Sequence, residues 1–410
     1  MIAAVRQRFL QGLGDAVAQP LGLAVSGGGD SIALLHLAVQ AGLAVRVATV
    51  DHGLRLESAA EADQVARICA GLKVPHTVLR WQGWDRRGNL QDQARRARYR
   101  LLADWARGCG LGAVVLAHTC DDQAETFVMR LARGAGVDGL AAMPVRRLSQ
   151  GITWLRPLLT VGRAELRDWL TGQGLPWVDD PSNEDEHYHR VRVRKALGTL
   201  AAVGIDAPTL AHVAGHLAQV RAALDVQVLA AARQFARTLA GDVVLDAACL
   251  TELPPEILRR LLRAALIWVA SSEYGPRGAA LARLIAAVQA GQPVTLLGCR
   301  VLVGRGVLRV TREWQAVRGL ATPPDVPWDQ RWQLIGPPGE GLQVRALGDS
   351  GLALCPLWRT TGLPRASLLA SPAVWCGADL MAAPLAGRPA GWQAETIGGP
   401  DAFHLSVLSH

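Results

Sequence analysis

The chain has 410 residues, enough for about two or three domains. Half of the residues are hydrophobic, but Arg, Gln and Asp interrupt the apolar stretches before any reaches the roughly 18 residues that a membrane span requires. The N-terminal residues lack a signal-peptide core, so we expect a cytoplasmic protein that does not contact a membrane. The formal net charge of +8 favours a polyanionic partner. The seven cysteines form no C-x-x-C pair, which argues against a zinc site and a disulfide framework.

Short apolar runs alternate with helical patterns over roughly the first half of the chain. The runs that predict strands are 21–25, 44–50, 76–79 and 113–117. The patterns that predict helices are 31–40, 58–72, 91–108 and 121–133. This alternation predicts an α/β fold with a doubly wound, mostly parallel sheet. In such sheets, ligands bind beyond the carboxyl ends of the strands.

The chain changes character twice beyond this region. A strongly helical stretch covers 210–239, and a mostly helical segment then ends in a hairpin-like alternation over 295–310. The remainder is rich in Trp, Gly and Pro and has β-like runs at 343–346 and 351–355. We expect its tryptophans to pack in a small core rather than to stack on nucleic-acid bases. The expected domains are a catalytic domain at 1–205, a linker helix with a mostly helical domain at 206–320, and a small α+β domain at 321–410.

A glycine-rich turn, Ser26–Ser31, joins the first predicted strand to the first predicted helix. Backbone N–H groups at a helix N-terminus bind anions, and glycines remove the side chains that would keep phosphate oxygens away. Asp30 would repel a phosphate, so we expect it to cap the helix or to hold Mg²⁺. A tight turn with a helix cap is the alternative. No lysine follows the glycines, as it would in a Walker A loop. The turn instead resembles the SGGxDS loop of the PP-loop ATP pyrophosphatases, which cleave ATP between its α- and β-phosphates.

A second motif, His118–Thr126, follows the strand predicted at 113–117 and opens a helix. Its Asp122 and Glu125 are three positions apart and therefore share one helical face. Two such carboxylates can coordinate Mg²⁺ or activate an amine. The alternative is a capped helix start, because acidic side chains also stabilise a helix N-terminus.

The His-x-x-Asp-Asp-Gln-x-Glu-Thr pattern of this motif resembles that of the tRNA(Ile)-lysidine synthetases, a family within the PP-loop enzymes. Further segments agree with signatures of that family in the same order: Asp51–Arg55, Gly88–Tyr99, Arg156–Leu159 and Trp177–Asn183. The resemblance covers residues 20–195. Two positions depart from the family pattern. Thr119 stands where a second histidine is usual, and Val191 replaces the asparagine of an R-N-x-x-R segment.

The resemblance implies ATP-dependent modification of the wobble cytidine of a tRNA(Ile) with a CAU anticodon. ATP adenylylates O2 of the cytosine, and free L-lysine then displaces AMP to give lysidine. The residues expected to bind ATP are Ser26, Gly27, Gly28, Gly29, Asp30, Ser31, Asp51 and His52. Those expected to act in catalysis are Asp122, Glu125, Arg95, Arg98, Arg190 and Arg194. The resemblance also implies Mg²⁺, which we expect at Asp30 and Asp122.

Two clusters of basic residues suit an RNA backbone, with solvated helix faces or salt bridges to Asp and Glu as the alternative. They consist of Arg86, Arg87, Arg95, Arg96, Arg98 and Arg100, and of His187, His189, Arg190, Arg192, Arg194 and Lys195. A homodimer is compatible with the sequence, which does not fix the oligomeric state. Two other functions remain as alternatives: a tRNA 2-thiocytidine thiolase, whose chemistry typically requires paired cysteines, and a catalytically silent RNA-binding protein.

Overall fold

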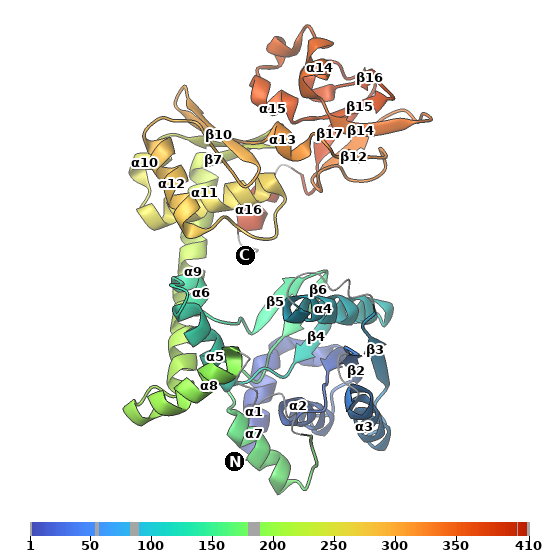
Figure 1. Cartoon of the computed structure of the whole chain (residues 1–410), viewed down its shortest axis with the longest axis vertical. Coiled ribbons are helices and arrows are strands. Elements are labelled where there is room, and N and C mark those ends of the chain that lie inside the picture. The colour runs from blue at the N-terminus through green and yellow to red at the C-terminus, as the bar shows by residue number, and fades with distance from the viewer. Residues whose placement is uncertain (1, 54–56, 83–89, 179–188, 400, 408–410) are drawn as a thin grey trace. The chain divides into compact units, whose positions relative to one another are not determined.

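The structure is a computed structural model of the whole chain (Figure 1). It describes all residues except 1, 54–56, 83–89, 179–188, 400 and 408–410. Contacts divide the chain into two compact units, Met1–Arg221 and Ala222–His410. The boundary expected between residues 205 and 206 falls just before helix α9 (Ala207–Phe235), which begins in the first unit and ends in the second.

A six-stranded sheet forms the centre of the first unit. Its order is β3-β2-β1-β4-β6-β5, and all neighbouring strands are parallel except β5 and β6. The strands are β1 (Leu21–Ala24), β2 (Val45–Asp51), β3 (His76–Arg80), β4 (Ala113–Leu116), β5 (Arg146–Ser149) and β6 (Ile152–Leu155). The predicted doubly wound, mostly parallel sheet is confirmed. Its order reverses between β1 and β4, and ligands bind at such a switch point.

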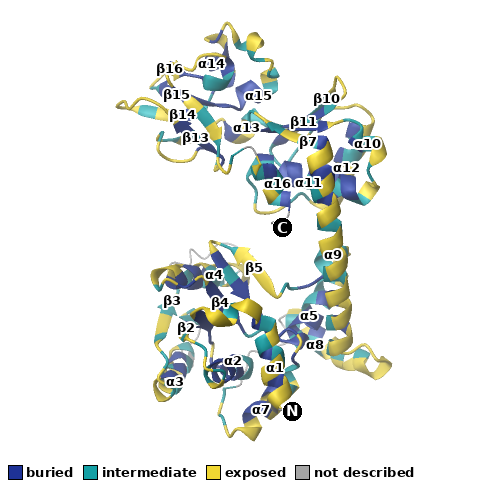
Figure 2. Ribbon diagram, turned by 180° about the vertical axis from the view of Figure 1, so that it is seen from behind, coloured by how far each residue is buried: buried dark blue, intermediate teal, exposed yellow. Residues whose placement is uncertain are grey.

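Helices cover both faces of this sheet (Figures 1 and 2). The helices that precede α9 are α1 (Ile2–Leu13), α2 (Gly29–Gln40), α3 (Glu57–Gly71), α4 (Leu90–Gly108), α5 (Cys120–Leu131), α6 (Val137–Leu140), α7 (Arg163–Gly172) and α8 (His189–Leu200), with short 3₁₀ turns at Gly14–Ala18 and Ala201–Val203. Helices α1, α2, α3 and α7 share one buried cluster that includes Phe9 and Trp169. Helix α4 packs on the other face, where Trp105 lies in a cluster with Trp154 of β6. This approach is close, because a Cβ at Gly22 of β1 would lie 2.7 Å from the Trp105 ring.

A five-stranded sheet of order β7-β8-β11-β10-β9 opens the second unit, with all pairs antiparallel. Its strands are β7 (Ala236–Leu239), β8 (Asp242–Asp246), β9 (Val294–Leu296), β10 (Cys299–Gly304) and β11 (Val307–Arg312), and its helices are α10 (Cys249–Glu252), α11 (Pro255–Ala270) and α12 (Gly278–Gln289). The hairpin predicted over 295–310 is confirmed as β10 and β11. The helix predicted over 210–239 ends earlier, at Phe235, because the next residues pair with β8.

The remaining chain forms a four-stranded sheet of order β12-β14-β15-β16 and a separate pair of strands, β13 and β17. The strands are β12 (Ala321–Thr322), β13 (Trp332–Ile335), β14 (Leu342–Ala346), β15 (Pro372–Cys376), β16 (Asp379–Ala382) and β17 (Gln393–Thr396). The helices are α13 (Trp314–Val317), α14 (Gly348–Ala353), α15 (Arg365–Leu369) and α16 (Ala402–Val407), with 3₁₀ turns at Trp358–Thr361 and Pro384–Ala386.

Two predictions for this region have opposite outcomes. The β-like run predicted at 343–346 lies in β14. The strand prediction at 351–355 is wrong, since these residues lie at the end of α14 and just after it. A short apolar run does not distinguish a strand from a buried helical turn, and here Leu352 and Cys355 are three positions apart and both enter the core. The prediction that the tryptophans pack in the core is confirmed: Trp328, Trp332, Trp375 and Trp392 are buried.

Among the described helices, no single one is long and apolar enough to cross a membrane. Helices α8 and α9 satisfy the length and composition criteria only as a pair bent by 97°. All seven cysteines are free thiols.

Candidate active site

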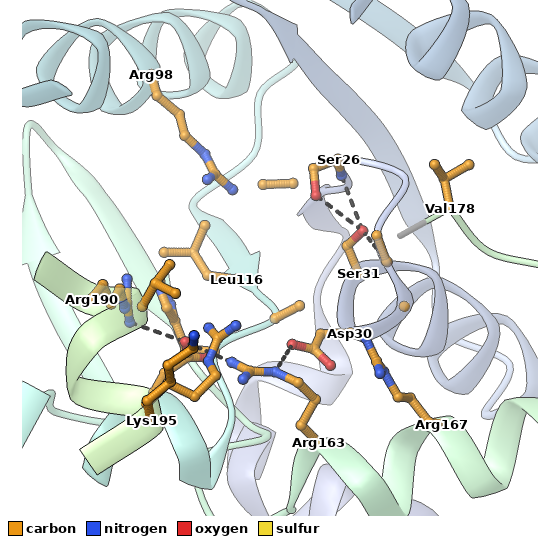
Figure 3. A pocket seen from close by; sticks show the side chains of 18 residues that line it. Ser26, Asp30, Ser31, Arg98, Leu116, Arg163, Arg167, Val178, Arg190 and Lys195 are labelled. Carbon is orange, nitrogen blue, oxygen red and sulfur yellow. Dashed lines mark hydrogen bonds and ion pairs between the residues drawn. The ribbon is translucent and has the colours of Figure 1, made fainter. Parts of the chain in front are cut away.

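The turn Ser26–Ser31 joins β1 to α2, as the sequence predicts (Figure 3). The hydroxyl of Ser31 holds the turn in this conformation, because its Oγ accepts hydrogen bonds from the N–H groups of Ser26 (3.1 Å) and Gly27 (3.2 Å). The same hydroxyl donates to the carbonyl of Gly28 at 2.8 Å. Gly27 has a φ of +96°, a conformation that favours glycine. The turn therefore curls around a serine side chain.

A cavity of about 850 Å³ adjoins this turn, within the range of about 300–1,000 Å³ typical of small-molecule sites. It lies beyond the carboxyl ends of β1 and β4, and residues of α5, α7 and α8 complete its wall. Two carboxylates, Asp30 and Asp122, line it. The cationic side chains in its wall are Arg98, Arg163, Arg167, Arg190, Arg194 and Lys195. This excess of positive charge suits a polyphosphate ligand.

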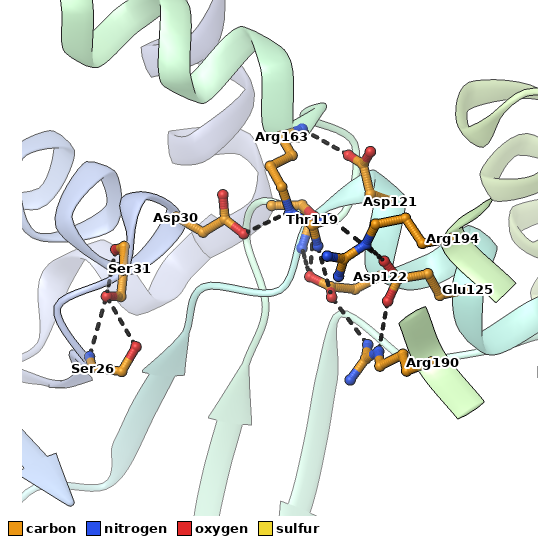
Figure 4. Close-up of polar contacts among 11 residues, drawn as sticks. Ser26, Asp30, Ser31, Thr119, Asp121, Asp122, Glu125, Arg163, Arg190 and Arg194 are labelled. Atoms are coloured by element: carbon orange, nitrogen blue, oxygen red, sulfur yellow. Dashed lines mark hydrogen bonds and ion pairs between the residues drawn. The ribbon is translucent and has the colours of Figure 1, made fainter. Parts of the chain in front are cut away.

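The carboxylate of Asp122 is fixed at the N-terminus of α5 by Thr119, the residue that departs from the family pattern (Figure 4). The backbone N–H of Thr119 donates to Asp122 Oδ2 at 2.8 Å, and its hydroxyl donates to the same oxygen at 3.0 Å. Asp122 Oδ1 is left to face cations of the cavity wall.

Arg163, at the start of α7, is a site residue that sequence reasoning missed. Its Nε donates to Asp30 Oδ2 at 3.2 Å, and its two Nη atoms lie 3.3 Å from Asp122 Oδ1 and 3.4 Å from Glu125 Oε1. Its backbone N–H donates to Asp121 Oδ2 at 2.7 Å. Although burial opposes this effect, the surrounding carboxylates raise the pKa of Arg163, so it stays charged.

Arg190 and Arg194 both reach Glu125 from α8. Arg190 Nε lies 2.6 Å from Glu125 Oε2, Arg194 Nε lies 2.9 Å from Oε1, and Arg190 Nη2 lies 3.0 Å from Asp122 Oδ1. Glu125 is completely buried and does not line the cavity, whereas Asp122 does. The two carboxylates predicted as an equivalent pair are therefore placed differently. Val191, the second departure from the family pattern, lines the cavity between the two arginines.

The ionisation of the two cavity carboxylates differs as well. Burial raises the pKa of Asp30 to about 6, against the opposing attraction of Arg163. Burial acts in the same direction on Asp122, but the charges of Arg190 and Arg163 and the hydrogen bond from the Thr119 N–H outweigh it and lower the pKa of that carboxyl. At neutral pH both groups are anionic.

The donor set fits a magnesium ion at Asp30. Asp30 lines the cavity; its Oδ2 is held by Arg163, while Oδ1 has no hydrogen-bond partner in the described part of the chain. The described residues contain no group of three or more His, Cys, Asp or Glu side chains placed to hold a metal. An ion here would be held by one or two carboxylates together with phosphate oxygens, as is usual for Mg²⁺.

Asp51 and His52 occupy different positions at the end of β2. Asp51 Oδ1 accepts hydrogen bonds from the Gly53 N–H at 2.9 Å and the Ser58 hydroxyl at 2.7 Å, an arrangement that connects the end of β2 to α3 and supports the turn at Gly53. His52 lines a 330 Å³ recess that shares Ser26 and Arg98 with the main cavity. Burial, followed by repulsion from Arg98, lowers the pKa of His52, so its imidazole is neutral.

Arg95 and Arg98 lie on α4 beside a second recess of about 250 Å³. His118 also lines it, and burial lowers the pKa of this imidazole to about 3. Its Nδ1 is buried and has no hydrogen-bond partner among the described residues. In the described part of the chain, Arg98 has no carboxylate partner either. The recess therefore offers an unpaired cation and a neutral imidazole to a polar ligand.

Several predicted residues lie outside the described part of the chain. These are Leu54, Arg55, Arg86, Arg87, Gly88, Asn89, Asp179, Asp180, Pro181, Ser182, Asn183 and His187.

Comparison with known families agrees with this geometry. A PP-loop domain model matches residues 1–201. The first unit, with its glycine turn and cavity, is thus a PP-loop ATP-binding domain. The chain is 52% identical over 400 residues to the tRNA(Ile)-lysidine synthase of Ruegeria pomeroyi, a match that covers 96% of each chain. It is also 41% identical to that of Methylobacterium nodulans, over 75% of this chain and 94% of the relative. The chain belongs to the tRNA(Ile)-lysidine synthase family.

Proposed function

We propose that this protein is a ligase that joins free L-lysine to the wobble cytidine of a tRNA(Ile) with a CAU anticodon, using ATP. One observation carries the proposal: in a chain 52% identical to a lysidine synthase over nearly its whole length, the glycine turn and the Asp122 carboxylate line one cavity. The reaction needs an ATP site and an amine site in contact, and this cavity offers both.

In the first step, cytosine O2 attacks the α-phosphorus of ATP. The O2–P bond forms, the bond to the bridging α,β-oxygen breaks, and pyrophosphate leaves. The N-terminus of α2 and the turn Ser26–Ser31 bind the leaving pyrophosphate, because their backbone N–H groups and the helix dipole favour anions. Asp30, with Asp122 as a second ligand, would hold Mg²⁺, which when bound neutralises phosphate charge.

In the second step, the lysine ε-amine attacks C2 of the adenylylated cytosine. The new C–N bond replaces the C–O bond, and AMP leaves. The amine must first lose a proton to become a nucleophile. Asp122 binds the lysine ammonium before this proton passes to water, since Asp122 lines the cavity and its negative charge attracts the cation. Glu125, which is buried behind the arginines, acts as a positioning residue for Arg190 and Arg194.

The arginines have separate roles in this proposal. Arg190 and Arg194 stabilise the charge that develops on the phosphate during both steps. Arg98, beside the recess that His118 lines, contacts the cytosine, and Arg95, beside the same recess, contacts an adjoining phosphate. His52 borders the nucleotide, and Asp51 acts through the turn that it supports.

The test measures pyrophosphate release from ATP and Mg²⁺, with and without tRNA(Ile) carrying CAU, followed by mass analysis of the tRNA nucleosides after lysine is added. We expect release that depends on this tRNA and a cytidine that gains the mass of lysine less water. The control is the same tRNA with uridine at the wobble position, which should give no product.

Other outcomes separate the alternatives. Pyrophosphate release without the lysine mass gain would support another PP-loop tRNA modification, such as thiolation. No release with any tRNA would support a silent RNA-binding protein. The homodimer stays a prediction, which light scattering of the purified protein tests directly.

A further inference from the structure

Five arginines of the first unit lie together without acidic partners. We call them the arginine band: Arg95, Arg130, Arg133, Arg147 and Arg221. In the part of the chain that the structure describes, none of the five forms an ion pair with a carboxylate. Other arginines of the same unit do, as Arg8 with Glu165 and Arg96 with Asp92 show. Unpaired charge of one sign is unfavourable in the free protein and indicates an anionic ligand.

The end of α5 is hydrogen-bonded to α6 and to the residue pair that follows it. Arg130 Nη1 donates to the carbonyls of Gly139 (2.8 Å) and Ala142 (2.9 Å), which holds α5 against the segment that leads into β5. Arg133 follows α5 and is exposed, and Arg147 is exposed on β5. The charges of Arg133 and Arg147 both act on Arg130, so the three arginines lie near one another.

A chain of aromatic contacts places Arg95 on the same side of the sheet as Arg147. The Arg95 guanidinium lies 5.3 Å from the Tyr99 ring centroid, and the Tyr99 ring lies 4.7 Å from that of Trp154. Trp154 of β6 is the direct register partner of Arg147, and directly opposed residues of antiparallel strands project from the same face.

Helix α9 brings Arg221 to this surface. The first half of α9 packs on α5, with Leu210 and Ala214 in a buried cluster with Ala124 and Phe127. Leu217 packs against the same cluster, and Arg221 is four positions further on, hence on the same helical face. Helices α5, α6 and this part of α9 lie side by side (Figure 1), and all three contribute to the same cluster.

The charges are close enough to influence one another. Burial, followed by repulsion from the other four members of the band, lowers the pKa of Arg130. The band also reaches the candidate active site, because Arg95 lines the 250 Å³ recess together with Arg98 and His118, and both of these also line the main cavity.

We propose that the arginine band binds the phosphate backbone of the anticodon stem of the substrate tRNA and so leads the reacting cytidine to the cavity. This inference rests on the proposed function. An RNA stem offers regularly spaced phosphates, and arginine binds phosphate oxygens with two parallel N–H donors. Among the described residues, no carboxylate forms an ion pair with these arginines and would have to be displaced first.

The test compares the full-length protein with the double variant Arg133→Gln/Arg147→Gln and with the triple variant that adds Arg221→Gln. The matched control is Arg6→Gln/Arg46→Gln, which removes two positive charges from exposed positions on α1 and β2, outside the band. The dissociation constant for an RNA hairpin with the tRNA(Ile) anticodon arm is measured over a salt series. Thermal melting of each variant checks that it is folded.

Removal of each arginine that binds a phosphate should reduce the slope of log affinity against log salt by about 1, so the slope should fall by about 2 in the double variant and hardly change in the control. With tRNA at saturation, the variants should release pyrophosphate at the wild-type rate. An unchanged slope, an equal reduction in the control, or a turnover defect at saturating tRNA would each overturn the proposal. Binding is measured without ATP or lysine. A wild type that binds the hairpin through the band but makes no lysidine therefore contradicts the proposed function alone.

Discussion

Arg163 Nε lies 3.2 Å from Asp30 Oδ2, although the two residues are 133 positions apart in the sequence. The same guanidinium contacts Asp122 and Glu125 of α5. One cation thus connects the helix that follows β1 to the helix that follows β4. These helices begin on either side of the point where the strand order reverses, and Arg163 neutralises the carboxylates that both bring to the cavity.

Replacement of Arg163 should impair catalysis even when the positive charge is kept. Lysine has a compact ammonium and cannot make the three-way contact of a planar guanidinium. We expect Arg163→Lys to slow tRNA-dependent pyrophosphate release by about 10²-fold or more, comparable to the loss of one preorganised donor. Arg163→Ala leaves buried carboxylates uncompensated and should lower the free energy of unfolding by about 3 kcal/mol.

Arg8→Lys is the control for Arg163, because Arg8 also pairs with a residue of α7, Glu165, but outside the cavity. Its partly exposed ion pair should contribute less than about 1 kcal/mol. Denaturant unfolding and pyrophosphate release measure both effects. Wild-type rates in Arg163→Lys would show that the guanidinium has only a structural role.

Asp122 and Glu125 should respond differently to loss of charge. Asp122 lines the cavity, so Asp122→Asn should raise the KM for lysine and weaken the dependence on Mg²⁺. Glu125 is buried against Arg190 and Arg194, so Glu125→Gln should lower kcat and stability while the KM for lysine changes little. Steady-state kinetics with lysine and Mg²⁺ as the varied components distinguish the role of Asp122 from that of Glu125. Identical changes in both variants would contradict the division of roles.

The free energy of unfolding should depend on pH through the ionisation of Asp30. Its pKa is raised by burial to about 6, from an ordinary value of 3.8. Between these values the folded chain keeps a proton that the unfolded chain has released, so the free energy of unfolding falls as pH rises from about 4 to about 6. Above that range this contribution is constant. The variant Asp30→Asn lacks this contribution. The difference between the wild type and the variant in free energy of unfolding, plotted against pH, therefore measures it. A difference that is flat from pH 4 to 6 would contradict the raised pKa.

The sequence predicts the parts of this site that depend on local patterns. The turn Ser26–Ser31 and the carboxylates of α5 are recognisable because their neighbours along the chain determine their geometry. Arg163 was not predictable in this way, since it begins an ordinary helix and its partners come from distant segments. The different burial of Asp122 and Glu125 could not be predicted from the sequence either, because it depends on how α8 packs against α5. The strand predicted at 351–355 failed for the related reason that only the surrounding core selects a helix there.

The last helix should stabilise a core formed by residues far earlier in the chain. Phe403 of α16 is fully buried among α11 and the five-stranded sheet, and its ring lies 5.9 Å from that of Trp268. Phe403→Ala should lower the free energy of unfolding of the second unit by about 3–5 kcal/mol, because apolar burial is removed and a cavity remains. Leu405→Ala, on the same helix but 67% exposed, should change this free energy by less than about 0.5 kcal/mol.

Hydrogen exchange resolved by peptide measures the effect of both variants. The amides of β10 and β11 should exchange faster in Phe403→Ala, while those of β1 and β4 keep wild-type rates because their core contains no residue of α16. Equal exchange in the two variants would show that α16 adds nothing to this core.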